Sequence, residues 1–309
     1  MSDTAGTRNV TTMDDQRWLA ERFEEHRGHL RAVAYRMLGS VSEADDAVQD
    51  TWLRFSNAGA DDVENMRGWL TTIVARVCLN ALRARNSRRE ELFPGHLPDP
   101  IVSPDSGGQP EEQVLLADSV GLALLVVLDA LSPAERLAFV LHDVFELPFD
   151  EVADVVGKTP AATRQLASRA RRRVRGADVR VPDSDISRQR QVIDAFYSAA
   201  RGGDFDTLVS LLDPEVVLRS DFGVKRPPAP AVIRGAEAVA RSSLMGAALP
   251  STELHPALIN GAAGVVVTAR GRPFVIMGFT VVQGRIVEID VIAGAERVRR
   301  LAAPVLNAR

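Results

Sequence analysis

Apolar residues repeat with helical spacing through most of the first 177 residues. Between Leu30 and Leu38 they keep a period of about 3.6, and Gly39 then interrupts the run. Residues 90–112 contain five prolines and three glycines, which is typical of a linker. Helical spacing resumes over 113–177. The pattern therefore predicts two all-α domains, at 15–89 and 113–177, joined by a linker.

The pattern changes after a second, shorter linker at 178–186. Two helices separated by Gly202 and Gly203 are followed by short β-branched runs, and VVQGRIVEIDVI predicts a hairpin about Gln283 and Gly284. Helices followed by strands indicate an α+β domain over 187–309. The fold class is thus multidomain, with two all-α domains before an α+β domain. Residues 1–14 lack the apolar segment of a secretory signal and are predicted to be a disordered tail.

Charge is segregated along the chain, although the net charge is only −4. Residues 76–89 hold five arginines and no acid, and residues 158–175 hold seven Lys or Arg and no acid, while acids dominate 14–64. Such a chain can bind a polyanion on one surface and a basic protein on another. The single cysteine, Cys78, excludes an internal disulfide and lies in an apolar helical pattern, as a small core residue would. With no long apolar run to span a membrane, we expect a cytoplasmic protein.

The acidic helix Ser42–Phe55 has two distinct faces at 100° per residue. Ala44, Val48 and Trp52 lie on the apolar face, which we expect to be buried. The opposite face is acidic and amidic with one leucine, and consists of Asp46, Gln49, Asp50 and Leu53. A solvated surface is the simpler interpretation of such a face. No His or Cys accompanies the carboxylates, so a metal site is not expected.

The helix expected over 66–86 combines an aromatic ring, an amide and cations on one stripe. Leu70, Ile73, Val74, Val77 and Ala81 would be buried. The exposed stripe would contain Trp69, Thr72, Arg76, Asn80 and Arg83. Aromatic rings stack on unpaired bases, arginines neutralise phosphates and Asn can bond a base edge, so the stripe favours single-stranded DNA. The alternative is a core tryptophan beside ordinary solvated arginines.

The second helical domain contains a helix-turn-helix pattern. Ser132, Pro133 and Glu135 form a capping box, Gly157 ends a short amphipathic helix, and Thr159 precedes a strongly basic helix. On that last helix Ala162, Leu166, Ala170 and Val174 would face inward. The outward residues suit the major groove of duplex DNA, and are Arg164, Gln165, Ser168, Arg171, Arg172 and Arg175.

Taken in order, these three motifs resemble a bacterial RNA polymerase sigma factor of the extracytoplasmic-function (group IV) type. SEADDAVQDTWLRF resembles the core-binding helix of region two, RGWLTTIVARVCLNALRAR its −10 helix, and LSPAERLAFVLHDVF with the basic helix resembles region four. The resemblance implies that Asp46, Gln49, Asp50 and Leu53 bind the β′ clamp of core polymerase, and that region four meets the β flap. It implies −10 contacts by Trp69, Arg76, Asn80 and Arg83. It implies −35 contacts by Arg164, Gln165, Ser168, Arg169, Arg171 and Arg172. No cofactor and no catalysed reaction are expected.

The C-terminal domain is similar to the SnoaL-like, NTF2-like cone that some of these sigma factors carry as a fused regulator. HLPDP resembles the linker motif of that subgroup, with Leu97, Pro98, Asp99 and Pro100 as its regulatory residues. Two other sequence motifs of that subgroup are only partly matched here, namely a glycine-rich loop at residues 221–225 and a terminal motif at residues 294–297. Phe222 and Val224 replace glycines, so a contact made by this loop is expected to be altered or lost.

Two other functions remain open. Cones of this type also house enzymes, and here Asp221, Asp290, His255 and Tyr197 would be the candidate acid–base residues, although no pair has a catalytic spacing. A ligand-sensing helix-turn-helix repressor would bind duplex DNA by itself, whereas a sigma factor needs core polymerase. Whether the cone takes a small-molecule ligand is left undecided.

Overall fold

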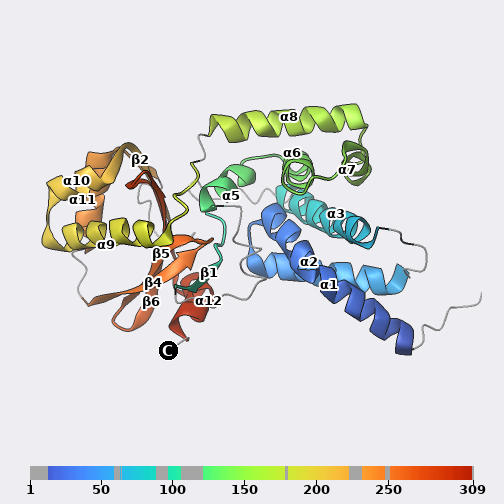
Figure 1. Cartoon of the computed structure of the whole chain (residues 1–309), viewed down its shortest axis with the longest axis horizontal. Coiled ribbons are helices and arrows are strands. Elements are labelled where there is room, and N and C mark those ends of the chain that lie inside the picture. The colour runs from blue at the N-terminus through green and yellow to red at the C-terminus, as the bar shows by residue number, and fades with distance from the viewer. Residues whose placement is uncertain are drawn as a thin grey trace, which may run out of the picture.

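The structure is a computed structural model, and it describes residues 13–58, 63, 65–87, 97–105, 121–177, 180–222, 232–247 and 251–307. Helical domain 1 consists of α1 (Met13–Leu38), α2 (Val41–Ala58) and α3 (Met66–Ser87), which pack against one another (Figure 1). Gly39 has a φ of +74°, which lets the chain reverse between α1 and α2 as its position in the sequence predicted. No helix among the described residues is long and apolar enough to cross a membrane.

Helical domain 2 contains the predicted helix-turn-helix. Its elements are α5 (Leu122–Asp129), α6 (Pro133–Phe139), the π-helical turn η1 (Val140–Val144), α7 (Phe149–Val156) and α8 (Pro160–Gly176). The capping box of Ser132 and Glu135 is formed, and the Thr159 hydroxyl accepts a hydrogen bond from the Ala162 amide at the start of α8. Gly157 ends α7 in the left-handed conformation. The local signals of this motif are confirmed.

The C-terminal domain is the predicted α+β domain. Its helices are α9 (Ile186–Gly202), α10 (Phe205–Leu211), α11 (Ala236–Ala247) and α12 (Ala295–Leu306). Its strands are β2 (Leu212–Asp221), β3 (Val232–Arg234), β4 (Thr252–Ile259), β5 (Ala262–Ala269), β6 (Arg272–Val282) and β7 (Arg285–Ala293). The hairpin joining β6 and β7 turns at Gln283 and Gly284, both with positive φ, as predicted.

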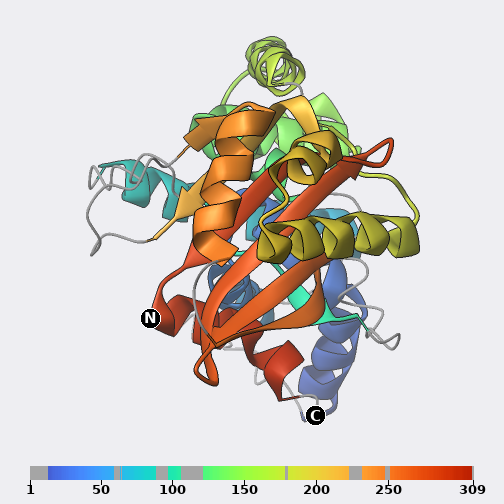
Figure 2. The same cartoon turned by 90° about the vertical axis from the view of Figure 1, so that its left-hand side faces the viewer.

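The sheet has helices on both faces. Its strand order is β1-β4-β5-β6-β7-β2-β3, and all neighbours are antiparallel except β2 and β7. Helices α9 to α11 cover one face, and Figure 2 shows them in yellow and orange in front of the sheet. We call this the inner face. Helix α12 packs on the opposite, outer face.

Strand β1 (Val102–Pro104) comes from the segment that the sequence predicted to be only a linker. It pairs with β4, with Val102 opposite Ile259, and so forms the first strand of the C-terminal sheet. The prolines around it argued against a strand. At the edge of a sheet, however, a proline is tolerated, because the missing amide costs no ladder bond.

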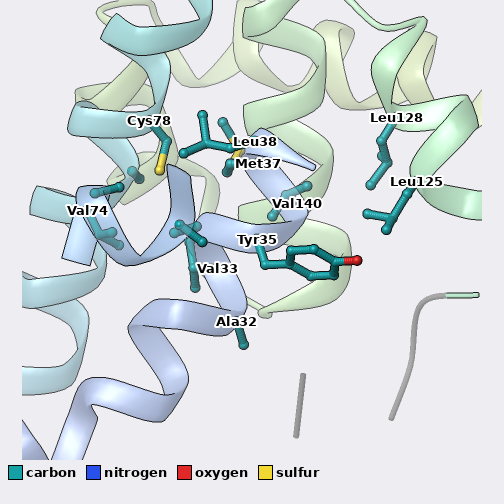
Figure 3. Close-up of a cluster of buried hydrophobic side chains, with 14 of the residues drawn as sticks. Ala32, Val33, Tyr35, Met37, Leu38, Val74, Cys78, Leu125, Leu128 and Val140 are labelled. Atoms are coloured by element: carbon teal, nitrogen blue, oxygen red, sulfur yellow. The ribbon is translucent and has the colours of Figure 1, made fainter. Parts of the chain in front are cut away.

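One hydrophobic core runs through all three domains. Figure 3 shows side chains of α1, α3, α5 and η1 converging, among them Leu38, Cys78, Leu128 and Val140. The same cluster continues through Leu97 of the linker into the outer face of the sheet and α12. A second, separate cluster lies between the inner face and α9 to α11. The three domains therefore share buried apolar surface, and the linker lies within it.

Candidate nucleic-acid and protein interfaces

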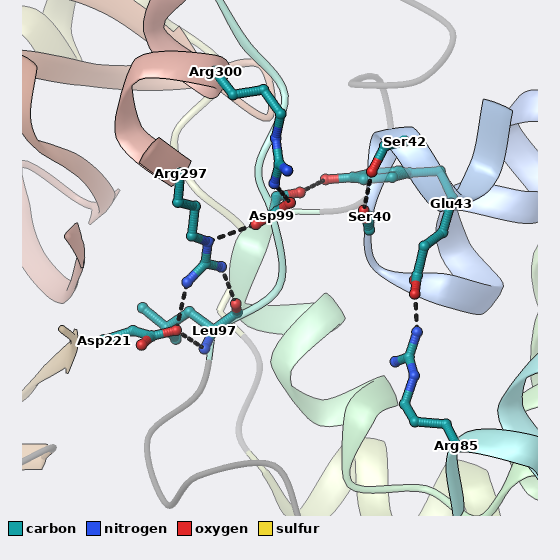
Figure 4. A network of polar contacts seen from close by, with 10 residues as sticks. Ser40, Ser42, Glu43, Arg85, Leu97, Asp99, Asp221, Arg297 and Arg300 are labelled. Atoms are coloured by element: carbon teal, nitrogen blue, oxygen red, sulfur yellow. Dashed lines mark hydrogen bonds and ion pairs between the residues drawn. The ribbon is translucent and has the colours of Figure 1, made fainter. Parts of the chain in front are cut away.

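The acidic face of α2 is exposed as predicted. Asp46, Gln49 and Asp50 are exposed and Leu53 is 52% exposed, while Ala44, Val48 and Phe55 on the other side are buried. The neighbouring acids are occupied, because Glu43 binds Arg85 at 2.6 Å (Figure 4) and Asp45 binds Arg31 at 2.5 Å. Among the described residues no cation lies within ion-pair distance of Asp46 or Asp50. Their carboxylates are therefore available to a basic partner.

Both tryptophans of the two candidate helices pack against the core. The Trp52 ring lies 5.2 Å from that of Phe23, and the Trp69 ring lies 5.6 Å from that of Phe55, edge to face. Each remains partly accessible. The core position predicted for Trp52 is thus confirmed. Trp69 combines the two interpretations, because its ring packs on Phe55 while the residue is only half-buried.

The remaining residues of the α3 stripe divide between solvent and helical domain 2. Arg76 and Asn80 are exposed, and Thr72 is half-buried. The Arg83 guanidinium donates a hydrogen bond to the Val156 carbonyl at the end of α7, with an N···O distance of 3.4 Å. Helix α3 therefore carries part of the contact between the two helical domains.

One prediction for the buried side of α3 is wrong, because Ala81 is exposed. The buried line follows steps of four residues through Leu70, Val74, Cys78 and Leu82. Ala81 falls beside this line.

The basic helix α8 presents most of its predicted DNA-binding side chains to solvent. Arg164, Gln165, Ser168, Arg169 and Arg172 are exposed, and Arg171 is half-buried. On the inward side Leu166 and Ala170 are buried, while Ala162 and Val174 are half-buried. Figure 1 shows α8 at the outer side of the molecule. The predicted division of the helix into two faces is confirmed.

Several α8 arginines also hold helical domain 2 together. Arg169 and Arg173 bind the two carboxylate oxygens of Glu135, at 2.9 and 2.5 Å, and Arg171 lies 2.8 Å from Asp143. Burial raises the pKa of Glu135, but hydrogen bonds from Ser132 and Arg169 outweigh it and hold that pKa below its ordinary value. The sequence could not show these pairs, because Glu135 lies 34 residues from Arg169.

The linker motif is bound on both sides through alternate backbone amides. The Leu97 amide donates to Asp221 Oδ2 at 3.0 Å, the Asp99 amide to the Gly39 carbonyl at 2.9 Å, and the Ile101 amide to Asn260 Oδ1 at 2.7 Å. Pro98 and Pro100, between them, have no amide hydrogen to donate. Every N–H group of residues 97–101 is therefore bonded, two to the C-terminal domain and one to helical domain 1.

Two arginines of α12 complete what we call the linker network, formed by Leu97, Asp99, Asp221, Arg297 and Arg300 (Figure 4). Arg297 donates to Asp99 Oδ1 and Asp221 Oδ2, both at 2.6 Å, and to the Leu97 carbonyl. Arg300 binds the second oxygen of Asp99 at 2.7 Å. Asp221 of the glycine-loop signature and Arg297 of the terminal signature therefore both contact the linker, whereas the altered contact expected of the loop itself stays a prediction. His96 and residues 223–225 lie outside the described part of the chain.

The two helical domains and the linker meet at Gly39. A methyl group placed on its α-carbon would lie 3.4 Å from both the Arg136 guanidinium of helical domain 2 and the Pro98 side chain of the linker. Arg136 is buried, donates to the Arg36 carbonyl of α1 at 3.0 Å and pairs with Asp129. Nearby, the Tyr35 hydroxyl donates to the Asp99 carbonyl at 2.9 Å. This junction was not predicted from the sequence.

The inner face of the C-terminal sheet borders a cavity of about 470 Å³. Of the four acid–base candidates only Tyr197 lines it. Asp221 holds the linker, His255 bonds Thr268, and Asp290 pairs with Arg219 at 3.1 Å. Burial raises the pKa of Asp290 to about 6, with Arg219 opposing and Glu288 adding to the shift. No Asp, Glu or His is found among the described residues that line the cavity.

Comparison with known protein families supports the division into two helical domains. The family model of sigma-70 region 2 matches residues 22–88, and that of sigma-70 region 4 matches residues 121–174. The two domains thus define a transcription initiation factor of the sigma-70 type. The extracytoplasmic-function (ECF) RNA polymerase sigma factor SigJ of Mycobacterium tuberculosis is 41% identical over 219 residues, which cover 71% of this chain and 70% of SigJ.

The likeness extends over the C-terminal domain. The probable ECF RNA polymerase sigma factor SigI of Mycobacterium tuberculosis is 34% identical over 272 residues, covering 86% of this chain and 90% of SigI. The crystal structure of Mycobacterium tuberculosis SigJ matches with a TM-score of 0.72 at 34% identity, over 90% of this chain and 97% of that one. The chain belongs to the extracytoplasmic-function family of RNA polymerase sigma factors. It is therefore a factor that directs core polymerase to promoters.

Proposed function

We propose that the fused C-terminal domain regulates this sigma factor by holding the linker, and with it the two promoter-binding domains, in one packed arrangement. The linker network carries the proposal. Its donors and acceptors come from the linker, β2 and α12, and the Asp99 amide joins it to Gly39 of helical domain 1. Its central groups are largely buried, with Asp221 2% and Arg297 17% exposed at their side chains. Charged hydrogen bonds of this kind are stronger than neutral ones.

The packing of the helical domains supports the same role. Arg83 on the predicted −10 helix bonds the end of α7, and Arg136 on α6 bonds the Arg36 carbonyl. A sigma factor that contacts two separate promoter elements must place its two DNA-binding domains apart. The packed arrangement therefore has to open during promoter binding, and the linker network opposes that opening.

The contact surfaces follow from the exposed faces. We assign core-polymerase docking to Asp46, Gln49, Asp50 and Leu53 on α2. We assign the −10 element to Arg76, Asn80 and Arg83 on α3 with the accessible part of Trp69. For the −35 element, Gln165, Ser168 and Arg172 are the base- and phosphate-binding groups, aided by Arg164. Arg169 and Arg171 act there while also bound to Glu135 and Asp143.

The C-terminal domain is a binding and regulatory domain in this proposal, and not an enzyme. General acid–base catalysis needs a titrating group within reach of the substrate. The carboxylates and the imidazole that could titrate lie outside the cavity, as described for Asp221, Asp290 and His255.

Pull-down of core polymerase tests the docking assignment. The wild type should bind, and Asp46→Arg/Asp50→Arg should abolish binding. Asp206→Arg/Glu215→Arg is the matched control, because it makes the same charge change on exposed acids of the C-terminal domain. Equal loss in both double variants would show that overall charge, and not the α2 face, is responsible.

Promoter-dependent transcription tests the regulatory role. Arg297→Gln removes the central cation of the network, while Arg299→Gln changes an exposed arginine of the same helix. We expect the first variant alone to alter the amount of transcript at a fixed amount of core polymerase. An increase would show that the network holds the factor inactive, and a decrease that it holds the active arrangement. Identical transcript levels in both variants and the wild type would refute the proposal.

A further inference from the structure

The cavity of the C-terminal domain is partly open to solvent. It lies between α9, α11 and the inner face of the sheet. Its deep walls are apolar and buried, with Phe196, Leu218 and Val267 among them, whereas Arg201 and Gly246 at the rim are exposed. A volume of about 470 Å³ is within the range of small-molecule pockets in proteins.

The Tyr197 hydroxyl is a polar group of the cavity with only a weak partner. The Tyr197 hydroxyl lies 3.0 Å from Met277 Sδ, and a thioether sulfur is a weak hydrogen-bond acceptor. Burial raises the pKa of this hydroxyl above its ordinary value, so the group stays protonated and able to donate. Buried hydroxyls normally donate to oxygen or nitrogen, and a ligand oxygen would supply what the protein does not.

We propose that this cavity binds a small, uncharged, largely apolar molecule that carries one acceptor oxygen, which takes the hydrogen bond of Tyr197. The lining is mostly apolar, and its other polar groups within the cavity are the neutral hydroxyls of Ser220, Ser242, Ser243 and Thr252, so it offers a charged ligand little compensation for lost hydration. Arg201 does not change this, because it lies at the exposed rim.

The cavity and the linker network share one segment of backbone. Ser220 and Phe222 line the cavity, while Asp221 between them points to the outer face and holds the Leu97 amide and Arg297. A molecule that displaces Ser220 or Phe222 therefore shifts the residue that holds the linker. Ligand binding is thus coupled to the regulatory contact, and this part of the inference rests on the proposed function.

Fluorescence titration with prodan, a neutral naphthyl ketone, tests the site in the full-length protein. We expect a dissociation constant of about 10–100 µM and a blue-shifted emission. Ala200→Phe, which fills the cavity from α9, should weaken binding at least about tenfold. No saturable binding by the wild type, or equal binding by the filled variant, would overturn the proposal.

The role of Tyr197 is tested by removing single groups from the protein and from the probe. Tyr197→Phe should weaken prodan binding about 3- to 10-fold. It should leave unchanged the binding of dimethylaminonaphthalene, which has the same rings without the carbonyl. Ser210→Ala is the control, because it removes a hydroxyl from an exposed position of the same domain, outside both the cavity and the linker network. An equal effect on both probes would exclude the hydrogen bond.

Asp221→Asn tests the coupling. Thermodynamic linkage is reciprocal: if the ligand changes the strength of the linker contact, then weakening the linker contact must change the affinity for the ligand. We expect the prodan dissociation constant to change at least about threefold. An unchanged constant would overturn the coupling and leave the site intact. Failure of prodan to bind would not affect the transcription test with Arg297→Gln, so the two proposals can fail separately.

Discussion

Replacing Arg297 by glutamine should release the linker from the C-terminal domain. Arg297 makes charged hydrogen bonds to Asp221 and Asp99, and such bonds contribute about 1.5–3 kcal/mol each. Asp221 is 2% exposed and would lose its cation, whereas Asp99 is 13% exposed and would keep Arg300. We therefore count the first bond fully and reduce the second. The expected loss is about 2–4 kcal/mol in the free energy of opening the linker.

Amide hydrogen exchange measures this opening directly. Residues 97–101 contain three amides, those of Leu97, Asp99 and Ile101, and each is hydrogen-bonded. A loss of about 2–4 kcal/mol corresponds to exchange about 30 to 1000 times faster at these amides. Local exchange is preferable to a melting curve for this purpose, because it reports opening of the linker, which need not accompany unfolding of a whole domain.

The control is Arg299→Gln, in which the network is complete. Its exchange at residues 97–101 should equal that of the wild type. If Arg297→Gln also exchanged at the wild-type rate, the ion pairs would contribute nothing to holding the linker. The buried apolar contacts of Leu97 would then be the cause of its position.

Three further predictions concern other parts of the molecule. Gly39→Ala should destabilise the packed arrangement by about 1–2 kcal/mol, because a side chain is strained at a φ of +74°. Faster hydrogen exchange of the Asp99 amide would report this loss, and unaltered exchange would contradict the prediction. Arg172→Ala should weaken promoter binding by the polymerase complex by about 1–3 kcal/mol and leave the melting temperature unchanged, whereas Arg169→Ala should also lower that temperature through loss of the Glu135 pair; identical behaviour of the two variants would refute the distinction. The folded-state pKa of Asp290 is about 6, which lies above the pKa of an unfolded Asp. The contribution of Asp290 to stability is therefore full below about pH 4 and is lost as the pH rises towards about 6. The loss is up to about 3 kcal/mol. The difference in melting temperature between the wild type and Asp290→Asn should therefore change across this range, and a constant difference would show that the pKa is not raised.

The features that the sequence predicted correctly are those with local physical causes. The two faces of α2 and α8 follow from helical periodicity. The ends of α6, α7 and α8 follow from the capping box, Gly157 and Thr159. The hairpin at Gln283 follows from the need for positive φ at its turn.

The features that were missed depend on partners far away in the chain. Strand β1 is defined by pairing with β4, more than 150 residues later, and a proline-rich segment gives no local sign of it. Arg169 was assigned to DNA alone because its partner Glu135 lies on another helix. The glycine-loop signature appeared degraded because most of its residues differ, yet Asp221, a side chain of this signature that bonds the linker, is present.

Strand β1 also changes how this protein can be divided into pieces. A fragment ending near residue 180 would keep β1 but lose its partner, leaving Ile101 and Val102 exposed to water. A fragment beginning near residue 187 would leave β4 as an open edge, able to pair with another copy of itself. The C-terminal domain is therefore complete only when residues of the linker are present. Separate expression of the cone should include residues 97–105, supplied either at its own terminus or as a peptide.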